Sequence, residues 1–315
     1  MPGTILVVGA TGNTGKSAVR NLSLRLQGRS VRIIALSRSK TGAAAQTLAQ
    51  LDGVEVEEKD WTEIDSAWLT ARSVAKVYIA PHNGPSQFAD ESGFYLALLQ
   101  ARVNWVVRVS TNHEYMSPVH PVYYGRAHWA IENLLSQPEF AALQWTSLQP
   151  NFFTASYLAS AAEWIQKFRK EGTQAPLCVV PAADAHVAML DPEDVGAVGA
   201  FILALDDPSP HASQRYVLSG PEDVSGNDIV KLVEKIVGTK VIETRFRDTQ
   251  WLNDLVTSGA YPEKVYPSIM AGFDCLWDGS CTKAKTPTSL AIRESPVNPS
   301  RTVEEALRAM IVTRA

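Results

Sequence analysis

Cysteine is scarce in this chain of 315 residues, which contains only Cys178, Cys275 and Cys281. An odd count without a Cys-x-x-Cys spacing argues against a disulfide framework and favours a reducing compartment. Apolar runs are short, and none approaches the ~18 residues of a membrane-spanning helix. The chain leads straight into the apolar segment 4–8, without the pattern of a secretory signal. These absences predict a cytoplasmic protein with no membrane partner.

An excess of positive charge is also missing. Lys and Arg number 29 against 33 Asp and Glu, so the net charge is −4. Because there is no basic run either, we expect no nucleic-acid partner. Hydrophobic residues make up 45% and charged residues 20%, which is ordinary for a globular protein with a sizeable core. At ~150 residues per domain, the length predicts two domains, or one large domain with an additional lobe.

Two common catalytic signatures do not occur. The six histidines form no His-x-x-x-His motif and no cluster with cysteine, so we predict no metal site. No Gly-x-Ser-x-Gly nucleophile elbow is present, which argues against a serine hydrolase.

The sequence does contain a regular alternation of apolar runs and helix-like stretches. It predicts strands at 5–8, 31–36, 54–58, 74–80, 105–110 and 145–148, with helices at 16–26, 43–51, 88–101 and 122–135. This rhythm predicts right-handed βαβ units and a doubly wound parallel sheet. After residue 150 it loosens, with helices expected at 152–169, 192–205, 228–237, 251–258 and 303–310 and strands at 177–180 and 215–218. Residues 271–300 are rich in Gly, Ser, Pro and Thr and receive no assignment.

The strongest local signal is the glycine-rich turn after the first predicted strand. It reads Gly9-Ala10-Thr11-Gly12-Asn13-Thr14-Gly15-Lys16-Ser17 and leads into the first helix. Glycines allow positive φ and close backbone approach, and a helix N-terminus offers free N–H groups to a phosphate. The turn therefore predicts phosphate binding by Gly9, Thr11, Gly12, Asn13, Thr14 and Gly15.

Two classes of phosphate-containing ligand fit this turn, a nucleoside triphosphate and a dinucleotide. Ala10-x-x-x-x-Gly15-Lys16-Ser17 nearly matches a P-loop, which also needs a strand ending in an acidic Mg²⁺ ligand. The candidate strands end in Leu36-Ser37, Ala80-Pro81 and Val109-Ser110, none of them acidic. Gly9-x-x-Gly12-x-x-Gly15 instead resembles the glycine pattern of dinucleotide-binding short-chain dehydrogenases. We favour the dinucleotide, with a nucleotide triphosphatase or a turn without ligand as alternatives.

The residues at the end of the second predicted strand indicate whether the dinucleotide is NAD or NADP. NAD is held there by Asp or Glu, and the 2′-phosphate of NADP by a basic residue. The sequence is Ser37-Arg38-Ser39-Lys40, with no acid and two cations. A guanidinium can hold a phosphate through two hydrogen bonds and stack on adenine. We therefore predict NADP(H), bound mainly by Arg38, with Lys40 and Ser37 beside it. The alternative is that Arg38 and Lys40 are solvated loop residues that bind no phosphate.

Over nearly its whole length the chain resembles the NmrA-like branch of the atypical short-chain dehydrogenase/reductase superfamily. The segments that carry this resemblance are Ile5 to Gly15, Lys59-Asp60-Trp61, Leu148 to Phe153, Asp191 to Gly196 and Tyr216 to Glu222. It implies a Rossmann-type sheet of order 3-2-1-4-5-6-7, with an NADP-binding domain over residues 1–150. Residues 151–315 would form mostly a small C-terminal α/β substrate lobe, interleaved with the Rossmann sheet.

The resemblance also implies roles for individual cofactor-binding residues. Asp60 and Trp61 would lie beside the adenine. The segment Ala80-Pro81-His82-Asn83 would run past the cofactor, and Pro150, Asn151 and Phe152 would lie by the nicotinamide. The family includes NADPH-dependent reductases, enzymes of secondary metabolism and NADP-binding regulators.

The catalytic pair of the superfamily is altered in this chain. Superfamily reductases use Tyr-x-x-x-Lys with an upstream Ser, whereas here Tyr124 is followed by His128. The i, i+4 spacing places both on one helix face. The resemblance implies Tyr124 as proton donor, Ser110 and Thr111 as substrate contacts, and His128 at the nicotinamide ribose. Because a neutral imidazole carries no charge, the phenol would be less acidified than beside a lysine.

Each of these residues also has a structural interpretation. Tyr124 could be a packing residue, His128 a surface residue, and Ser110 and Thr111 could bond local backbone. His113 and His120, in the stretch before this helix, are alternative proton donors.

Aromatic residues gather in the predicted lobe, including Phe152, Phe153, Tyr157, Trp164, Trp251, Tyr261, Tyr266, Phe273 and Trp277. Most belong in a core, but a few facing the nicotinamide favour a flat, hydrophobic small-molecule substrate. We expect Phe153 as a wall of its site and Trp277 as a lid. The sequence thus predicts an NADPH-dependent oxidoreductase that transfers hydride to a C=O, C=N or conjugated C=C bond. Alternatives are a non-catalytic NADP(H)-sensing regulator with a protein partner, and a redox-neutral isomerase or cyclase.

Overall fold

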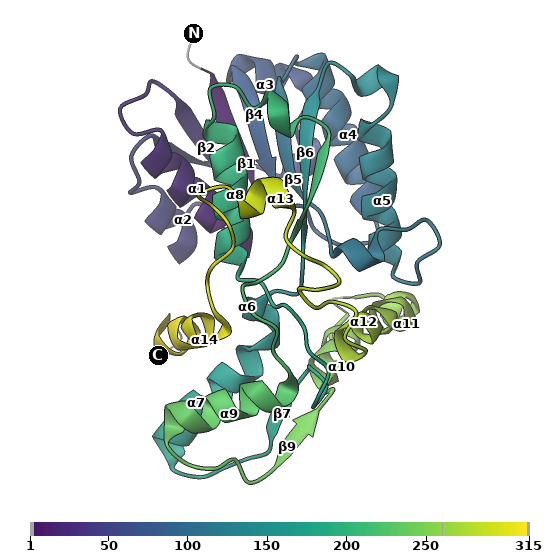
Figure 1. Ribbon diagram of the computed structural model, residues 1–315. Coiled ribbons are helices and arrows are strands. Elements are labelled where there is room, and N and C mark those ends of the chain that lie inside the picture. The colour runs from purple at the N-terminus through teal and green to yellow at the C-terminus, as the bar shows by residue number, and fades with distance from the viewer. Residues whose placement is uncertain (1–2, 260, 314–315) are drawn as a thin grey trace.

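Seven parallel strands form the central sheet of the computed structural model, which describes residues 3–259 and 261–313 (Figure 1). Their order is β3-β2-β1-β4-β5-β6-β8, and every neighbouring pair runs parallel. The strands are β1 (Thr4–Val8), β2 (Arg32–Ser37), β3 (Val54–Glu58), β4 (Val74–Ile79), β5 (Trp105–Val109), β6 (Gln144–Pro150) and β8 (Gln214–Leu218). The predicted Rossmann-type fold and strand order are confirmed, with β8 as seventh strand.

Helices cover both faces of this sheet because alternate strand residues point to opposite sides. Ile5 and Val7 of β1 belong to the core on one face, and Leu6 and Val8 to the core on the other. The first face carries α1 (Asn13–Arg25), α2 (Ala43–Leu48) and α8 (Pro192–Ala204). The second carries α3 (Ser66–Ala71), α4 (Gln87–Gln100) and α5 (Tyr123–Leu135). The sheet is the middle of three layers (Figure 1).

A smaller lobe lies at the carboxyl edge of the sheet (Figure 1). It contains a parallel pair of strands, β7 (Leu177–Val179) and β9 (Thr244–Phe246). Its helices are α6 (Thr154–Tyr157), α7 (Ala159–Glu171), α9 (Gly226–Val237), α10 (Gln250–Thr257), α11 (Tyr266–Met270), α12 (Asp274–Trp277) and α14 (Val303–Thr313). Another helix, α13 (Leu290–Arg293), follows a segment in which Ser289 hydrogen-bonds β8. Short 3₁₀ turns lie at Trp61–Glu63, His113–Tyr115, Pro138–Phe140, Ser209–His211, Glu263–Val265 and Ala271–Phe273.

Some elements differ from their prediction. The single helix expected over 152–169 is wrong, because α6 and α7 are separate helices. The chain before α6 is extended, since Leu190 accepts from Thr154 N–H and donates to the Phe152 carbonyl. α3 and β9, six and three residues long, are too short for periodicity to reveal. α1 begins at Asn13 instead of Lys16, because Gly12 already takes the N-cap position.

The turn between β1 and α1 is tightly folded and needs its glycines. Gly9 has a φ of +76°, which favours glycine. The Gly12 N–H donates to the Gly9 carbonyl at 2.9 Å. A Cβ on Gly15 would lie 2.0 Å from that same carbonyl oxygen. The first turn of α1 can therefore approach the end of β1 only because residue 15 has no side chain.

A buried ion network joins the second face of the sheet to α4 and α5. Arg108 of β5 is fully buried, and its Nη2 lies 3.2 Å from Oε2 of Glu91. Its Nη1 lies 3.4 Å from Glu132, a buried residue that also pairs with the half-exposed Arg215 at 2.8 Å. Two cations thus balance two carboxylates. Burial would lower the pKa of Arg108, but the neighbouring carboxylates outweigh it and raise that pKa. Arg108 is charged at every physiological pH.

This network also holds the strand ends in place. Glu132 accepts hydrogen bonds from Ser110 at 2.8 Å and from Gln149 at 3.1 Å, at the ends of β5 and β6. The Tyr95 hydroxyl donates to Glu91 at 2.7 Å. Because buried charges need partners to offset their lost hydration, these contacts form a single interdependent set.

Replacing Gly15 with alanine should destabilise the fold. The added methyl group meets a backbone oxygen that cannot rotate away, and overpacking of this kind costs roughly 1–3 kcal/mol. The matched control is Gly93→Ala in α4, where a Cβ would meet nothing within 4 Å. It should leave stability unchanged or raise it. Urea unfolding measures both variants, and equal midpoints for the two would contradict the steric argument.

Replacing Arg108 with methionine should be more damaging. It leaves Glu91 and Glu132 without their buried cation, and breaking a buried pair costs about 3–5 kcal/mol. The control is Arg32→Met, which removes an arginine from a half-exposed pair with Glu55 and should cost no more than ~1 kcal/mol. The measurement is the free energy of unfolding in urea. A similar loss in both variants would show that burial of Arg108 does not matter.

Candidate functional site

The carboxyl edge of the sheet contains a topological switch point. β1 lies between β2 and β4, so the chain leaves β1 in one direction for β2 and returns on its other side as β4. Ligands of doubly wound sheets bind at such a point. The turn from Gly9 to Gly15 lies there, at the N-terminus of α1, where the first N–H groups of a helix have no acceptor within it. Gly12 and Asn13 are exposed, so this end of α1 is open to an anion.

The end of β2 presents two cations beside this turn. β2 pairs in register with β1, so both strands end at the same edge of the sheet. The Ser37 hydroxyl donates to the Ser39 carbonyl at 2.7 Å, which folds the loop back on itself. Arg38 and Lys40 are exposed, and neither side chain has an ion pair or hydrogen bond with the described residues. Both remain available for a phosphate, and their binding roles stay predictions.

The predicted adenine contacts lie after β3. Asp60 accepts from the Thr62 N–H at 2.9 Å, and this bond and that of the Thr62 hydroxyl lower the pKa of the Asp60 carboxyl. The Trp61 ring is half-buried and lies 5.7 Å from Phe94 and 5.8 Å from His82, measured between ring centroids. Trp61 therefore joins the segment after β3 to the segment after β4.

The segment after β4 begins beside the glycine turn. Ala80 donates to the Val8 carbonyl at 3.2 Å, and Pro81 follows it. His82 accepts from the Gly84 N–H on Nδ1 and so donates from Nε2 to Asp90, at 3.0 Å each. Both ring nitrogens of His82 are therefore occupied. The next residue, Asn83, ends the segment expected to run past the cofactor.

A cavity of about 160 Å³ opens at the ends of β4, β5 and β6. Its predicted lining residues are Ser110, Thr111, Tyr124, Pro150, Asn151, Phe152 and Phe153. Asn83, from the segment expected to run past the cofactor, also lines it, and the prediction missed Asn112, Tyr115, Ser156 and Tyr157. Of the missed residues, Tyr157 carried a signal as an aromatic residue directly after the predicted nicotinamide segment. The structure thus brings together residues from three strand ends and from α5 and α6.

Tyr124 projects from α5 into this cavity, and burial raises its pKa well above the ordinary value. Its ring lies 5.7 Å from that of Tyr115, whose hydroxyl donates to the Gly272 carbonyl. A phenol with a raised pKa is protonated throughout the neutral pH range. Tyr124 can therefore hold a proton, but it is a weak acid.

His128 lies behind the cavity and is not among its lining residues. Arg108 Nη2 lies 2.7 Å from its Nδ1, and because a guanidinium only donates, Nδ1 must accept. The ring proton is therefore on Nε2, 3.0 Å from Oδ1 of Asn83. Burial and the Arg108 charge lower the pKa of His128 well below its usual value. His128 is neutral, and the protein occupies both of its nitrogens.

The remaining predicted residues divide between the cavity and its surroundings. Ser110 and Thr111 both line the cavity, and the Ser110 hydroxyl donates to Glu132. His113 donates from Nδ1 to Gln149 Oε1 at 2.9 Å, and His120 accepts from the Val122 N–H at 3.1 Å. Neither histidine lines the cavity. Their catalytic roles stay predictions.

Trp277 packs inside the lobe. Its Nε1 donates to the Val180 carbonyl at 2.8 Å, and its ring stacks on Phe273 with centroids 5.4 Å apart. Trp277 does not line the cavity, so its role as a lid stays a prediction.

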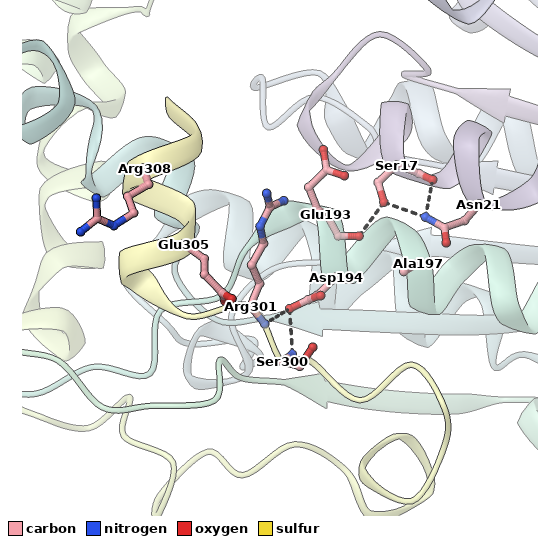
Figure 2. A pocket seen from close by; sticks show the side chains of 9 residues that line it. All are labelled: Ser17, Asn21, Glu193, Asp194, Ala197, Ser300, Arg301, Glu305 and Arg308. Carbon is pink, nitrogen blue, oxygen red and sulfur yellow. Dashed lines mark hydrogen bonds between the residues drawn. The ribbon is translucent and has the colours of Figure 1, made fainter. Parts of the chain in front are cut away.

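A larger groove of about 660 Å³ lies between α1, α8 and α14 (Figure 2). Its charged groups already have protein partners. Asp194 accepts from the backbone N–H groups of Ser300 and Arg301, Glu193 pairs with Arg20, and Arg301 pairs with Asp191. The groove has no aromatic wall and is less suited to an apolar ligand than the smaller cavity.

Residues 3–259 and 261–313 contain no group of three or more His, Cys, Asp or Glu side chains that could hold a metal ion. They also contain no helix with the length and apolar character needed to cross a membrane.

Solved structures with the same fold include several reductases. An NADPH-dependent quinone oxidoreductase of Escherichia coli, solved with NADPH, is 20% identical, with a TM-score of 0.69 over 97% of this chain and 99% of that chain. A triphenylmethane reductase of Citrobacter sp., complexed with NADP(H), is 17% identical, with a TM-score of 0.68 over 98% and 99%. A Staphylococcus aureus protein described as a nucleoside-diphosphate-sugar epimerase is 13% identical, with a TM-score of 0.67 over 97% and 99%. These likenesses establish a shared fold.

No curated protein sequence matches the chain. The model of the NmrA-like family matches residues 1–304, which is nearly the full length. The family predicted from the sequence is therefore confirmed, and this protein belongs to the NmrA-like family.

Proposed function

We propose that this protein is an NADPH-dependent oxidoreductase that reduces a flat, hydrophobic small molecule. One observation carries the proposal: a single edge of the sheet has a phosphate-binding turn with two unpaired cations at one end and an aromatic cavity at the other. A dinucleotide spans such a crevice, with its pyrophosphate at the helix N-terminus. The residues fit NADPH because Gly15 lets α1 approach β1 closely and Arg38 is free to bind a 2′-phosphate.

When bound, NADPH supplies a hydride from C4 of its nicotinamide. The chain supplies the surroundings that such a transfer needs. Tyr115, Phe152 and Tyr157 give the cavity aromatic walls that exclude water and align a planar acceptor. Thr111 and the Tyr124 hydroxyl are the polar groups that can orient an acceptor carbonyl, imine or conjugated alkene. Alignment in a dry pocket is the main contribution of the protein.

Tyr124 is the proposed proton donor. Reduction of a C=O or C=N bond consumes one proton besides the hydride, and Tyr124 carries one because burial raises its pKa. The neighbours described as quinone and triphenylmethane reductases support an acceptor of the flat, conjugated kind.

A second candidate is a non-catalytic sensor of NADP(H). The observation in its favour is the neutral His128, because the charged lysine that would acidify Tyr124 is missing. Oxidation of NADPH in the presence of ketones, imines and quinones separates the two. Tight cofactor binding with no turnover across this panel would support the sensor, and substrate conversion without net NADPH loss would indicate a redox-neutral enzyme.

Arg38→Ala should weaken NADPH binding roughly 10- to 100-fold, because a hydrogen bond to a charged group contributes about 1.5–3 kcal/mol. NADH, which lacks the 2′-phosphate, should bind about as it does to the wild type. Calorimetry with both cofactors measures this, with exposed Arg169 of α7, changed to Ala, as the control. Equal weakening of NADPH and NADH would refute a 2′-phosphate contact.

Tyr124→Phe should lower turnover ~10²-fold or more if this phenol donates the proton. The control is Tyr216→Phe in β8, whose hydroxyl is hydrogen-bonded to His211 and which does not line the cavity. It should leave most of the turnover intact. Because burial raises the pKa of Tyr124, the wild type should show no loss of donor activity between pH 6 and pH 9. Unchanged turnover in the Phe variant would assign the proton to another group.

A further inference from the structure

Asn83 is a residue of the cavity wall whose side-chain orientation follows from its hydrogen bond to His128. It follows β4 directly after His82, and β4 lies next to β1 and its glycine turn. The Tyr123 hydroxyl donates to its backbone carbonyl, so the main chain here is tied to α5. Its side chain is partly open to solvent and lines the cavity. Asn83 is thus placed where the nicotinamide half of a dinucleotide would lie.

The direction of the Asn83 amide follows from a chain of donors and acceptors. Arg108 donates to Nδ1 of His128 at 2.7 Å, which leaves the single ring proton on Nε2. That nitrogen lies 3.0 Å from Oδ1 of Asn83, which accepts. The amide nitrogen of Gln87 also lies 3.0 Å from Nε2, but it has an acceptor of its own in Glu91 at 2.8 Å. The oxygen of the Asn83 amide is therefore the end that faces His128.

The other end of this amide is an unused donor. Within residues 3–259 and 261–313, the amide nitrogen of Asn83 makes no hydrogen bond. A reversed amide would set Nδ2 against the protonated Nε2 of His128, two donors with no acceptor. The charge of Arg108 therefore determines, through one imidazole, that the cavity wall presents an N–H donor.

We infer that Asn83 donates a hydrogen bond to an oxygen of the nicotinamide riboside of NADPH, and that His128 is the positioning residue that orients it. The inference rests on the proposed function. The ribose contact that the resemblance implies for His128 is made by Asn83 instead. The imidazole orients the Asn83 amide and does not touch the ribose itself.

The experiment compares two ligands that share an adenosine half. Adenosine 2′,5′-bisphosphate carries the 2′-phosphate but no nicotinamide, whereas NADPH carries both. By calorimetry, Asn83→Ala should raise the Kd for NADPH roughly threefold to tenfold, the range for one neutral hydrogen bond, and leave adenosine 2′,5′-bisphosphate unchanged. Asn83→Asp, which keeps the acceptor for His128 but loses the donor, should lose at least as much NADPH affinity. The control is Asn104→Ala, an exposed asparagine just before β5 at the opposite edge of the sheet.

The role of His128 is tested by a double-mutant cycle. His128→Leu should weaken NADPH binding as Asn83→Ala does, and the double variant should be no weaker than either alone. His128→Gln retains one donor and one acceptor and should recover part of the affinity, which keeps the test usable if the leucine variant does not fold. Additive losses in the double variant would overturn the coupling of the two residues.

The outcomes separate this inference from the proposed function. If the wild type binds neither NADPH nor adenosine 2′,5′-bisphosphate, the proposed function fails. If the wild type binds both, and Asn83→Ala and Asn83→Asp keep the wild-type ratio of the two affinities, the inference is wrong and the proposed function stands.

Discussion

The positive charge of Arg108, buried in the sheet, is the constraint to which the rest of the site is adjusted. Burial of a guanidinium costs hydration free energy that nearby carboxylates must offset. Here Glu91 and Glu132 do so, from the two helices α4 and α5 that cover this side of the sheet. These carboxylates in turn need donors, which Tyr95, Ser110, Gln149 and Arg215 provide. Because each partner satisfies another, the ends of β5 and β6 and the faces of α4 and α5 are held as one unit.

The same charge shapes the chemistry of the cavity. His128 lies against Arg108, so protonating the imidazole would put two cations together in a buried space, and its pKa falls. Tyr124, one helical turn earlier, therefore has no cationic neighbour at residue 128. Burial raises the pKa of its phenol, and the hydrogen bond with Tyr115 offsets only part of that rise. Arg108 fixes the tautomer of His128, and burial makes Tyr124 a weak acid.

Sequence reasoning found those features that depend on local pattern. The first five predicted strands lie within a residue of their observed bounds, because buried parallel strands are short apolar runs with clear ends. The glycine turn was equally visible, since close backbone approach requires glycine. The ion network was not found, because Arg108, Glu91 and Glu132 are far apart in the sequence and each resembles an ordinary surface residue. Asn83 lies in the segment expected to run past the cofactor, but its contact with His128 was not predicted, because His128 lies 45 positions away.

The change from lysine to histidine at position 128 is better understood together with Arg108 than as a lost catalytic residue. The network already balances two cations with two carboxylates, so a lysine at 128 would add a third positive charge to a buried space that has no free anion. A lysine at position 128 would therefore bring an unbalanced positive charge close to Arg108 in this arrangement. A reductase built this way has a phenol that gives up its proton reluctantly. Under the proposed function, such a phenol is best matched to acceptors that delocalise the negative charge left by hydride transfer, such as conjugated carbonyl compounds, because these need the least help from an acid. On that proposal, the buried charge of Arg108 bears on the choice of substrate because it leaves residue 128 neutral.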